Sequence, residues 1–156
     1  MKLCIRQRIF SWFDTYDVTS EDGVTFFTIR GELALFHHRL TVLDANGREV
    51  ASLEERMLTF RKHFYIDIPN GASGELIKEW TLFQPRFFLD FVPWTVTGDF
   101  FGWDYSILNG PTEIARIYKQ FFTWGDTYVI DVANPNDALL CLLIVVGIDI
   151  TKEDHH

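Results

Sequence analysis

Four cationic side chains at two predicted corners of the chain have types and spacing that could bind an anion. Arg61, Lys62 and His63 are consecutive, and Arg86 lies at the next corner. Guanidinium and ammonium groups donate charge-assisted hydrogen bonds to phosphate oxygens. Two such corners at one end of the domain would therefore form a patch for a phosphate or a lipid headgroup. The alternative is that these side chains are solvated or paired with neighbouring acids.

A second cluster, His37-His38-Arg39, contains two adjacent histidines. Neighbouring residues of a strand point to opposite faces, so two such histidines rarely ligate one metal ion. No cysteine or carboxylate spacing nearby completes a ligand set. We therefore expect no metal site and no cofactor.

Two Asp-Thr pairs, Asp14-Thr15 and Asp126-Thr127, occur in matching contexts near the two ends of the chain. Such side chains hydrogen-bond the local backbone in turns. Because a catalytic site is seldom duplicated in this way, we interpret both pairs as structural. The sequence also contains no P-loop, GxSxG or dinucleotide-binding motif, which predicts a protein that is not an enzyme. An enzyme whose site is assembled from scattered loop residues is the alternative.

The elements that position these side chains are short runs rich in Val, Ile, Phe, Tyr and Thr, separated by turns rich in Gly, Asn and Asp. This spacing is typical of an antiparallel meander. The runs expected to be strands include 24–29, 40–43, 64–68, 75–83 and 128–132.

An internal repeat indicates four related strand–corner–strand units. Segment 49–68 resembles 113–132, and segment 5–18 resembles 117–130. Each unit has an aromatic residue at a corner, a second aromatic at the start of the next strand, and an aliphatic residue that shares its face. The four copies are Trp12/Tyr16/Val18, Phe60/Phe64/Ile66, Phe83/Phe87/Leu89 and Trp124/Tyr128/Ile130.

The C-terminal segment is expected to be a buried helix. Asn134 can cap it, and Pro135 suits its first turn. Residues 138–148 are apolar on every side of the helix, so the helix must be surrounded. A closed antiparallel barrel of about twelve strands can hold one helix and leaves no exposed sheet edge. We therefore predict a mainly β domain over 1–152, with a central helix at about 135–151 and a tail at 153–156.

Four polar residues interrupt the apolar face of the predicted strands. Gln7, Glu55, Lys78 and Lys119 are each bracketed by apolar residues two positions away. Strict alternation turns them inward, where they would need partners such as a lysine for Glu55 or Asp149 on the helix. A bulge that turns them outward is the alternative.

The overall charge limits the classes of partner. The chain has 156 residues and a formal net charge of −8, which argues against a general nucleic-acid binder and weakens nonspecific attraction to anionic membranes. The apolar run 138–148 is shorter than the about 20 residues that span a bilayer, and the N-terminus lacks a signal-peptide pattern. Cys4 and Cys141 suit buried thiols in a reducing compartment. A soluble, cytoplasmic protein is expected.

The sequence resembles the LURP-one-related family, within the tubby-like superfamily that also includes the phospholipid scramblases. The residues that carry the resemblance are the opening 5–12, the strand 30–33, the corner 83–86, the motif 124–128 and the helix start Asn134-Pro135. The resemblance covers nearly the whole chain and implies a twelve-stranded barrel around a central C-terminal helix. Tubby proteins bind phosphoinositides and scramblases act on membranes, but the basic clusters and membrane-spanning length of those relatives are missing from this chain.

The functional prediction is a non-enzymatic tubby-like binding or scaffold module that recognises a phospholipid headgroup or another anionic or apolar ligand. The residues expected to contact an anion are Arg61, Lys62, His63 and Arg86. The expected partner is a phospholipid or a protein. A purely structural or protein-interaction domain is a further alternative.

Overall fold

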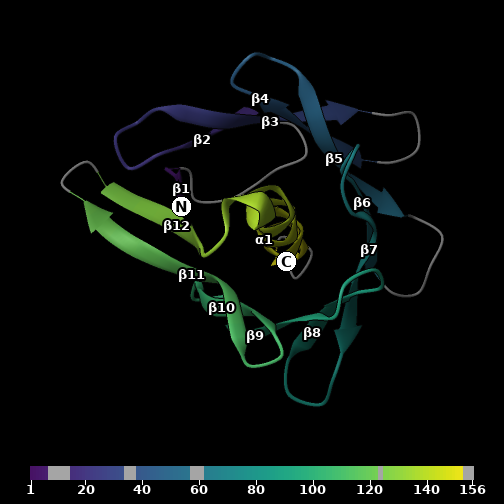
Figure 1. Cartoon of the computed structure of the whole chain (residues 1–156). Coiled ribbons are helices and arrows are strands. Elements are labelled where there is room, and N and C mark those ends of the chain that lie inside the picture. The colour runs from purple at the N-terminus through teal and green to yellow at the C-terminus, as the bar shows by residue number, and fades with distance from the viewer. Residues whose placement is uncertain (7–14, 34–37, 57–61, 123–124, 153–156) are drawn as a thin grey trace.

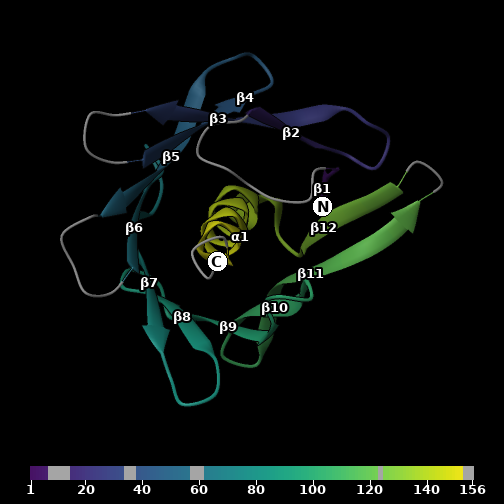
Figure 2. The same cartoon turned by 180° about the vertical axis from the view of Figure 1, so that it is seen from behind.

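The computed structural model describes residues 1–6, 15–33, 38–56, 62–122 and 125–152. These residues form a closed antiparallel barrel of twelve strands around one α-helix. Figures 1 and 2 show the helix enclosed by the ring of strands. The strands are β1 (Lys2–Ile5), β2 (Thr15–Thr19), β3 (Thr25–Leu33), β4 (His38–Asp44), β5 (Glu49–Arg56), β6 (Lys62–Asp67), β7 (Ser73–Trp80), β8 (Pro85–Leu89), β9 (Trp94–Asp99), β10 (Asp104–Asn109), β11 (Thr112–Phe122) and β12 (Gly125–Val132).

The predicted fold class is therefore confirmed. Each strand pairs with the next along the chain, and β1 closes the barrel against β12, where Leu3 is opposite Ile130. One predicted strand is too long, because β7 ends at Trp80 rather than at Phe83. The backbone turns at Thr81, whose hydroxyl donates to the Gln84 carbonyl oxygen at 2.5 Å.

The helix α1 (Ala138–Lys152) follows a 3₁₀ turn, η1 (Pro135–Asp137). The Asn134 side chain caps this turn and accepts a hydrogen bond from the backbone N–H of Asn136 at 3.0 Å. Side chains are buried on all sides of α1, as its uniformly apolar sequence requires. At Gly147 an added Cβ would lie 2.7 Å from Leu76 Cδ2, so glycine lets the helix lie close to the barrel wall.

The inner face of the wall carries the aromatic residues that the repeat places at strand starts. Tyr16, Phe64, Phe87 and Tyr128 are buried at the starts of β2, β6, β8 and β12. Of the four corner aromatics, Trp12, Phe60 and Trp124 lie outside the described residues, and Phe83 is exposed. The repeat itself remains an interpretation of the sequence.

The hairpins alternate between the two rims of the barrel because consecutive strands are antiparallel. α1 begins at the rim where β12 ends. It ends at the rim that carries the β9–β10 hairpin, because Lys152 Nζ lies 5.0 Å from the ring centroid of Trp103. The two rims are therefore distinguished by the direction of the helix.

Candidate functional site

The rim at which α1 ends displays large apolar side chains, and we call it the aromatic rim. The β7–β8 hairpin carries Leu82 and Phe83, each 95% exposed, and Trp80, which is 63% exposed. Phe101 in the β9–β10 hairpin and Phe121 near the end of β11 are also exposed. These strands follow one another around the barrel, so the side chains occupy one arc of the rim. Exposed apolar groups gathered in this way are typical of an interaction surface.

Two of the predicted anion-binding corners lie at this same rim. β6 begins at Lys62 and β8 begins at Pro85, and both strands start where β7 ends. Arg61 and the side chain of Lys62 lie outside the described residues. Arg86 is exposed, and its Cζ lies 5.7 Å from the centroid of the Phe88 ring. A guanidinium group therefore accompanies the exposed apolar hairpin tip.

His63 has a carboxylate partner. Its Nδ1 lies 2.8 Å from Glu75 Oε2 on the neighbouring strand β7. A carboxylate at this distance repels an incoming phosphate. His63 is therefore less suited than Arg86 to contact an anion.

The mouth of the barrel inside the aromatic rim contains charged residues that the alternation of the strands predicted. Lys78 is 5% exposed, and its Nζ lies 4.7 Å from the Trp80 ring centroid. Glu55 has a histidine partner, because its Oε2 lies 2.9 Å from His38 Nδ1. Lys119 is more exposed and pairs with Asp126 at 3.2 Å. Gln7 and His37 lie outside the described residues.

The last turn of α1 completes this mouth. Lys152 Nζ lies 3.3 Å from the carboxylate of Asp149, which is buried. Burial lowers the pKa of Lys152, while the Asp149 carboxylate opposes that shift. The cation also lies favourably at the negative end of the helix dipole. The carboxylates at the mouth thus each lie close to a basic side chain.

The opposite rim, at which α1 begins, is acidic, and we call it the acidic rim. The cations there, among the residues that the structure describes, are Lys2, Arg48 and the amino group of Met1. The acids at its turns and strand ends are Glu21, Asp22, Asp44, Glu49, Asp67, Asp90, Glu113, Asp131 and Asp137. Among the described residues, the excess of acidic over basic groups is therefore concentrated at this end of the barrel.

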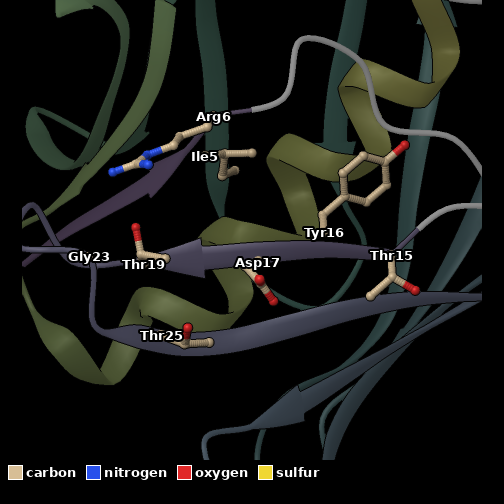
Figure 3. Close-up of a pocket in the computed structure, with 8 residues that line it drawn as sticks. All are labelled: Ile5, Arg6, Thr15, Tyr16, Asp17, Thr19, Gly23 and Thr25. Atoms are coloured by element: carbon tan, nitrogen blue, oxygen red, sulfur yellow. The ribbon is translucent and has the colours of Figure 1, made fainter. Parts of the chain in front are cut away.

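A hollow of about 330 Å³ opens in the wall beside β2. It is lined by Ile5 of β1 and by Arg6, which follows that strand, by residues of β2, by Gly23 in the β2–β3 turn and by Thr25 at the start of β3, as Figure 3 shows. Asp17 in the hollow accepts a hydrogen bond from the Thr28 hydroxyl at 3.2 Å. The sequence analysis did not identify this hollow.

Neither cysteine is in a disulfide, and both are buried. Burial raises the pKa of the Cys141 thiol to about 12, and it also raises that of Cys4. Within the described parts of the chain, no three His, Cys, Asp or Glu side chains lie close enough to hold a metal ion. The helices of these parts include none with the length and apolar character needed to cross a bilayer.

The comparisons with known proteins agree with the fold. The uncharacterized protein YxjI of Bacillus subtilis (strain 168) is 24% identical over 149 residues, which cover 96% of this chain and 92% of YxjI. The X-ray structure of an Arabidopsis thaliana protein matches with a TM-score of 0.60 at 16% identity, covering 96% of this chain and 90% of that one. This likeness supports the tubby-like fold. The family model described as LURP-one-related matches residues 1–149, so the chain belongs to the LURP-one-related family.

Proposed function

We propose that this protein is a binding module whose aromatic rim docks on phospholipid surfaces, with Arg86 contacting a headgroup phosphate. The observation that carries this proposal is the β7–β8 hairpin tip, where Leu82 and Phe83 are each 95% exposed. Transfer of one such side chain from water to an apolar phase is favourable by about 1.5–3 kcal/mol. Two adjacent side chains at a tip can therefore supply a useful part of the binding free energy.

The neighbours of the tip suit the bilayer interface. Trp80 is 63% exposed beside the tip, and tryptophan favours the headgroup level, where its ring is partly apolar and partly hydrated. Arg86 is the second residue of the strand that follows the tip and is exposed as well. Its guanidinium can donate two parallel hydrogen bonds to a phosphate. The hairpin thus places apolar side chains at its tip and places a tryptophan and an arginine closer to the barrel.

The distribution of charge favours one orientation of the domain. The acidic rim is at the far end of α1 from the tip, and an anionic surface repels it. Among the described residues of the aromatic rim, acidic and basic side chains form pairs and there is no comparable acidic excess. This arrangement supports docking by the aromatic rim despite the net charge of −8.

The experiment is co-sedimentation with vesicles of phosphatidylcholine, with and without about 30% phosphatidylserine. Replacing both Leu82 and Phe83 by Ser should lower the partition coefficient by about tenfold or more on both vesicles. Arg86→Glu should lower it mainly on the vesicles that contain phosphatidylserine.

The matched control is Val24→Ser, since Val24 is an apolar residue of 63% exposure at the acidic rim. It should bind like the wild type. Equal binding by the wild type and the Leu82/Phe83 variant, or no binding by the wild type, would contradict the proposal.

A further inference from the structure

The strands β1 and β2 pair over a short length, and the hollow lies beside this pairing. β1 has only four residues, and its recorded pairing with β2 is the single position at which Cys4 is opposite Thr19. The other edge of β1 pairs with β12 over all four of its residues. The short contact leaves room beside Arg6, which directly follows β1, for the hollow of about 330 Å³.

Both signs of charge line the hollow. In Figure 3 Arg6 extends from the β1 side, and the Thr19 hydroxyl points toward the side on which its guanidinium lies. Asp17 projects from the middle of β2, and the Thr25 hydroxyl points toward it from β3. Ile5 and Tyr16, which are both buried, contribute the apolar part of the lining.

These groups retain hydrogen-bonding capacity for a ligand. A guanidinium has five N–H donors, so Arg6 can donate to an anion in addition to its contacts within the protein. The Asp17 carboxylate accepts one hydrogen bond from Thr28 and has lone pairs for further donors. The threonine hydroxyls can donate or accept. The hollow thus presents a cationic donor, an anionic acceptor and neutral hydroxyls within one small volume.

The pairing of opposite charges limits the class of ligand. A simple anion that approaches Arg6 meets the repulsion of Asp17, and a simple cation that approaches Asp17 meets the repulsion of Arg6. A molecule that carries both charges gains from both groups. The volume lies at the small end of the range for ligand pockets, which is about 300–1,000 Å³, so the molecule must be compact.

We propose that the β1–β2 hollow binds a compact zwitterion, in which an ammonium group is joined by a short carbon chain to a phosphate or a carboxylate. The anionic group accepts hydrogen bonds from Arg6 and the Thr19 hydroxyl. The ammonium donates to Asp17, and the Thr25 hydroxyl accepts from it. The ligand is either a free small molecule or the headgroup of an amine-bearing phospholipid, and the two sources share this chemistry.

The test is a titration of the full chain by calorimetry with phosphoethanolamine and with serine, each at up to about 10 mM, a range that detects millimolar binding. Inorganic phosphate and ethanolamine, which carry one kind of charge each, are the comparison probes. At least one zwitterion should bind about tenfold more tightly than either comparison probe.

Two variants, each of which removes one charge, assign the site. Arg6→Gln and Asp17→Asn should each weaken zwitterion binding by about tenfold, because each removes one charged partner. Arg48→Gln and Asp67→Asn make the same changes at the acidic rim and should leave binding unaltered. Circular dichroism and thermal unfolding confirm that all four variants fold.

Vesicles distinguish the source of the ligand. If the headgroup is the ligand, adding phosphatidylethanolamine to phosphatidylcholine vesicles should strengthen binding, and Arg6→Gln and Asp17→Asn should abolish that increment. If the ligand is a free molecule, only the calorimetric titration responds. Binding to vesicles of phosphatidylcholine alone, whose headgroup has no N–H donor, tests the aromatic rim separately, and neither variant should change it.

The inference is overturned if no zwitterion binds in either format, or if phosphate or ethanolamine alone binds as tightly as the more tightly bound of the two zwitterions. It also fails if binding is insensitive to both Arg6→Gln and Asp17→Asn.

Discussion

The turns that the structure describes at the two rims of this barrel differ in what they present to solvent. At the acidic rim, polar side chains fasten the turns, as where Asp44 accepts hydrogen bonds from the backbone N–H groups of Asn46 and Arg48. At the aromatic rim, the β7–β8 turn is closed by Thr81 and Gln84, and Leu82 and Phe83 project into solvent. Turn closure therefore does not require the apolar residues. Their exposure is the observation on which the proposed docking by the aromatic rim rests.

The largest expected effect is on the free energy of unfolding, and it distinguishes the buried helix α1 from the exposed tip of the β7–β8 hairpin. Ile144 in the middle of α1 is 0% exposed, whereas Leu82 is 95% exposed. Ile144→Ala should lower the free energy of unfolding by about 2–5 kcal/mol, because it removes packed methyl groups and leaves a cavity. Leu82→Ala should change it by less than about 0.5 kcal/mol. Urea unfolding of both variants measures this difference, and similar losses in the two would refute the distinction.

A smaller effect, which depends on pH, concerns the acidic-rim half of α1. Cys141 has a pKa raised from 9.0 to about 12 by burial. The folded state keeps the thiol proton where the unfolded state loses it, so this contribution to stability is complete below pH 9.0 and is lost as the pH rises toward 12. Three pKa units correspond to at most about 4 kcal/mol.

Urea unfolding at several pH values measures this contribution. Cys141→Ala should lose less stability than the wild type between neutral pH and about pH 10.5, whatever its stability at neutral pH. The variant Ile144→Ala serves as the control, because its deficit should be the same at every pH. Parallel pH profiles for Cys141→Ala and the wild type would show that the thiol is not protected.

The smallest expected effect is at the acidic rim itself. The 15 residues of α1 separate the two rims by about 22 Å, and electrostatic interactions in physiological salt are screened beyond about 8 Å. Replacing Glu21 by Gln and Asp22 by Asn should therefore change binding to vesicles that contain phosphatidylserine by less than about twofold. Co-sedimentation beside Arg86→Glu provides the comparison. A large gain in binding would mean that the acidic rim also approaches the membrane.

The sequence predicted the architecture because its signals are local or periodic. Asn134 and Pro135 mark the start of the helical segment, and the uniformly apolar run that follows requires enclosure. The alternation along β7 correctly predicted that the Lys78 side chain faces the inside of the barrel. The partner of Glu55 could not be predicted, because His38 comes from β4, and only the register of two neighbouring strands brings them together.

The candidate sites were harder to predict for the same reason. Apolar alternation up to Phe83 predicts a continuing strand, although the Thr81 side chain closes a turn there. The hollow depends on the shortness of β1 and on side chains from three strands, and no local pattern encodes such a gap. A cluster of threonines at positions 15, 19, 25 and 28 was the available signal.

The closure of the barrel by its first strand has a consequence for how the chain is made. The amino group of Met1 donates to the carbonyl oxygen of Val132 at 2.9 Å, and β1 pairs with β12. A ribosome releases β1 first, but β1 has to wait for β12 and α1 before it gains these partners. Until then the inner faces of the finished strands lack the helix that covers them. We therefore expect the nascent chain to need protection from aggregation until β12 and α1 have been made, after which the wall closes around the helix.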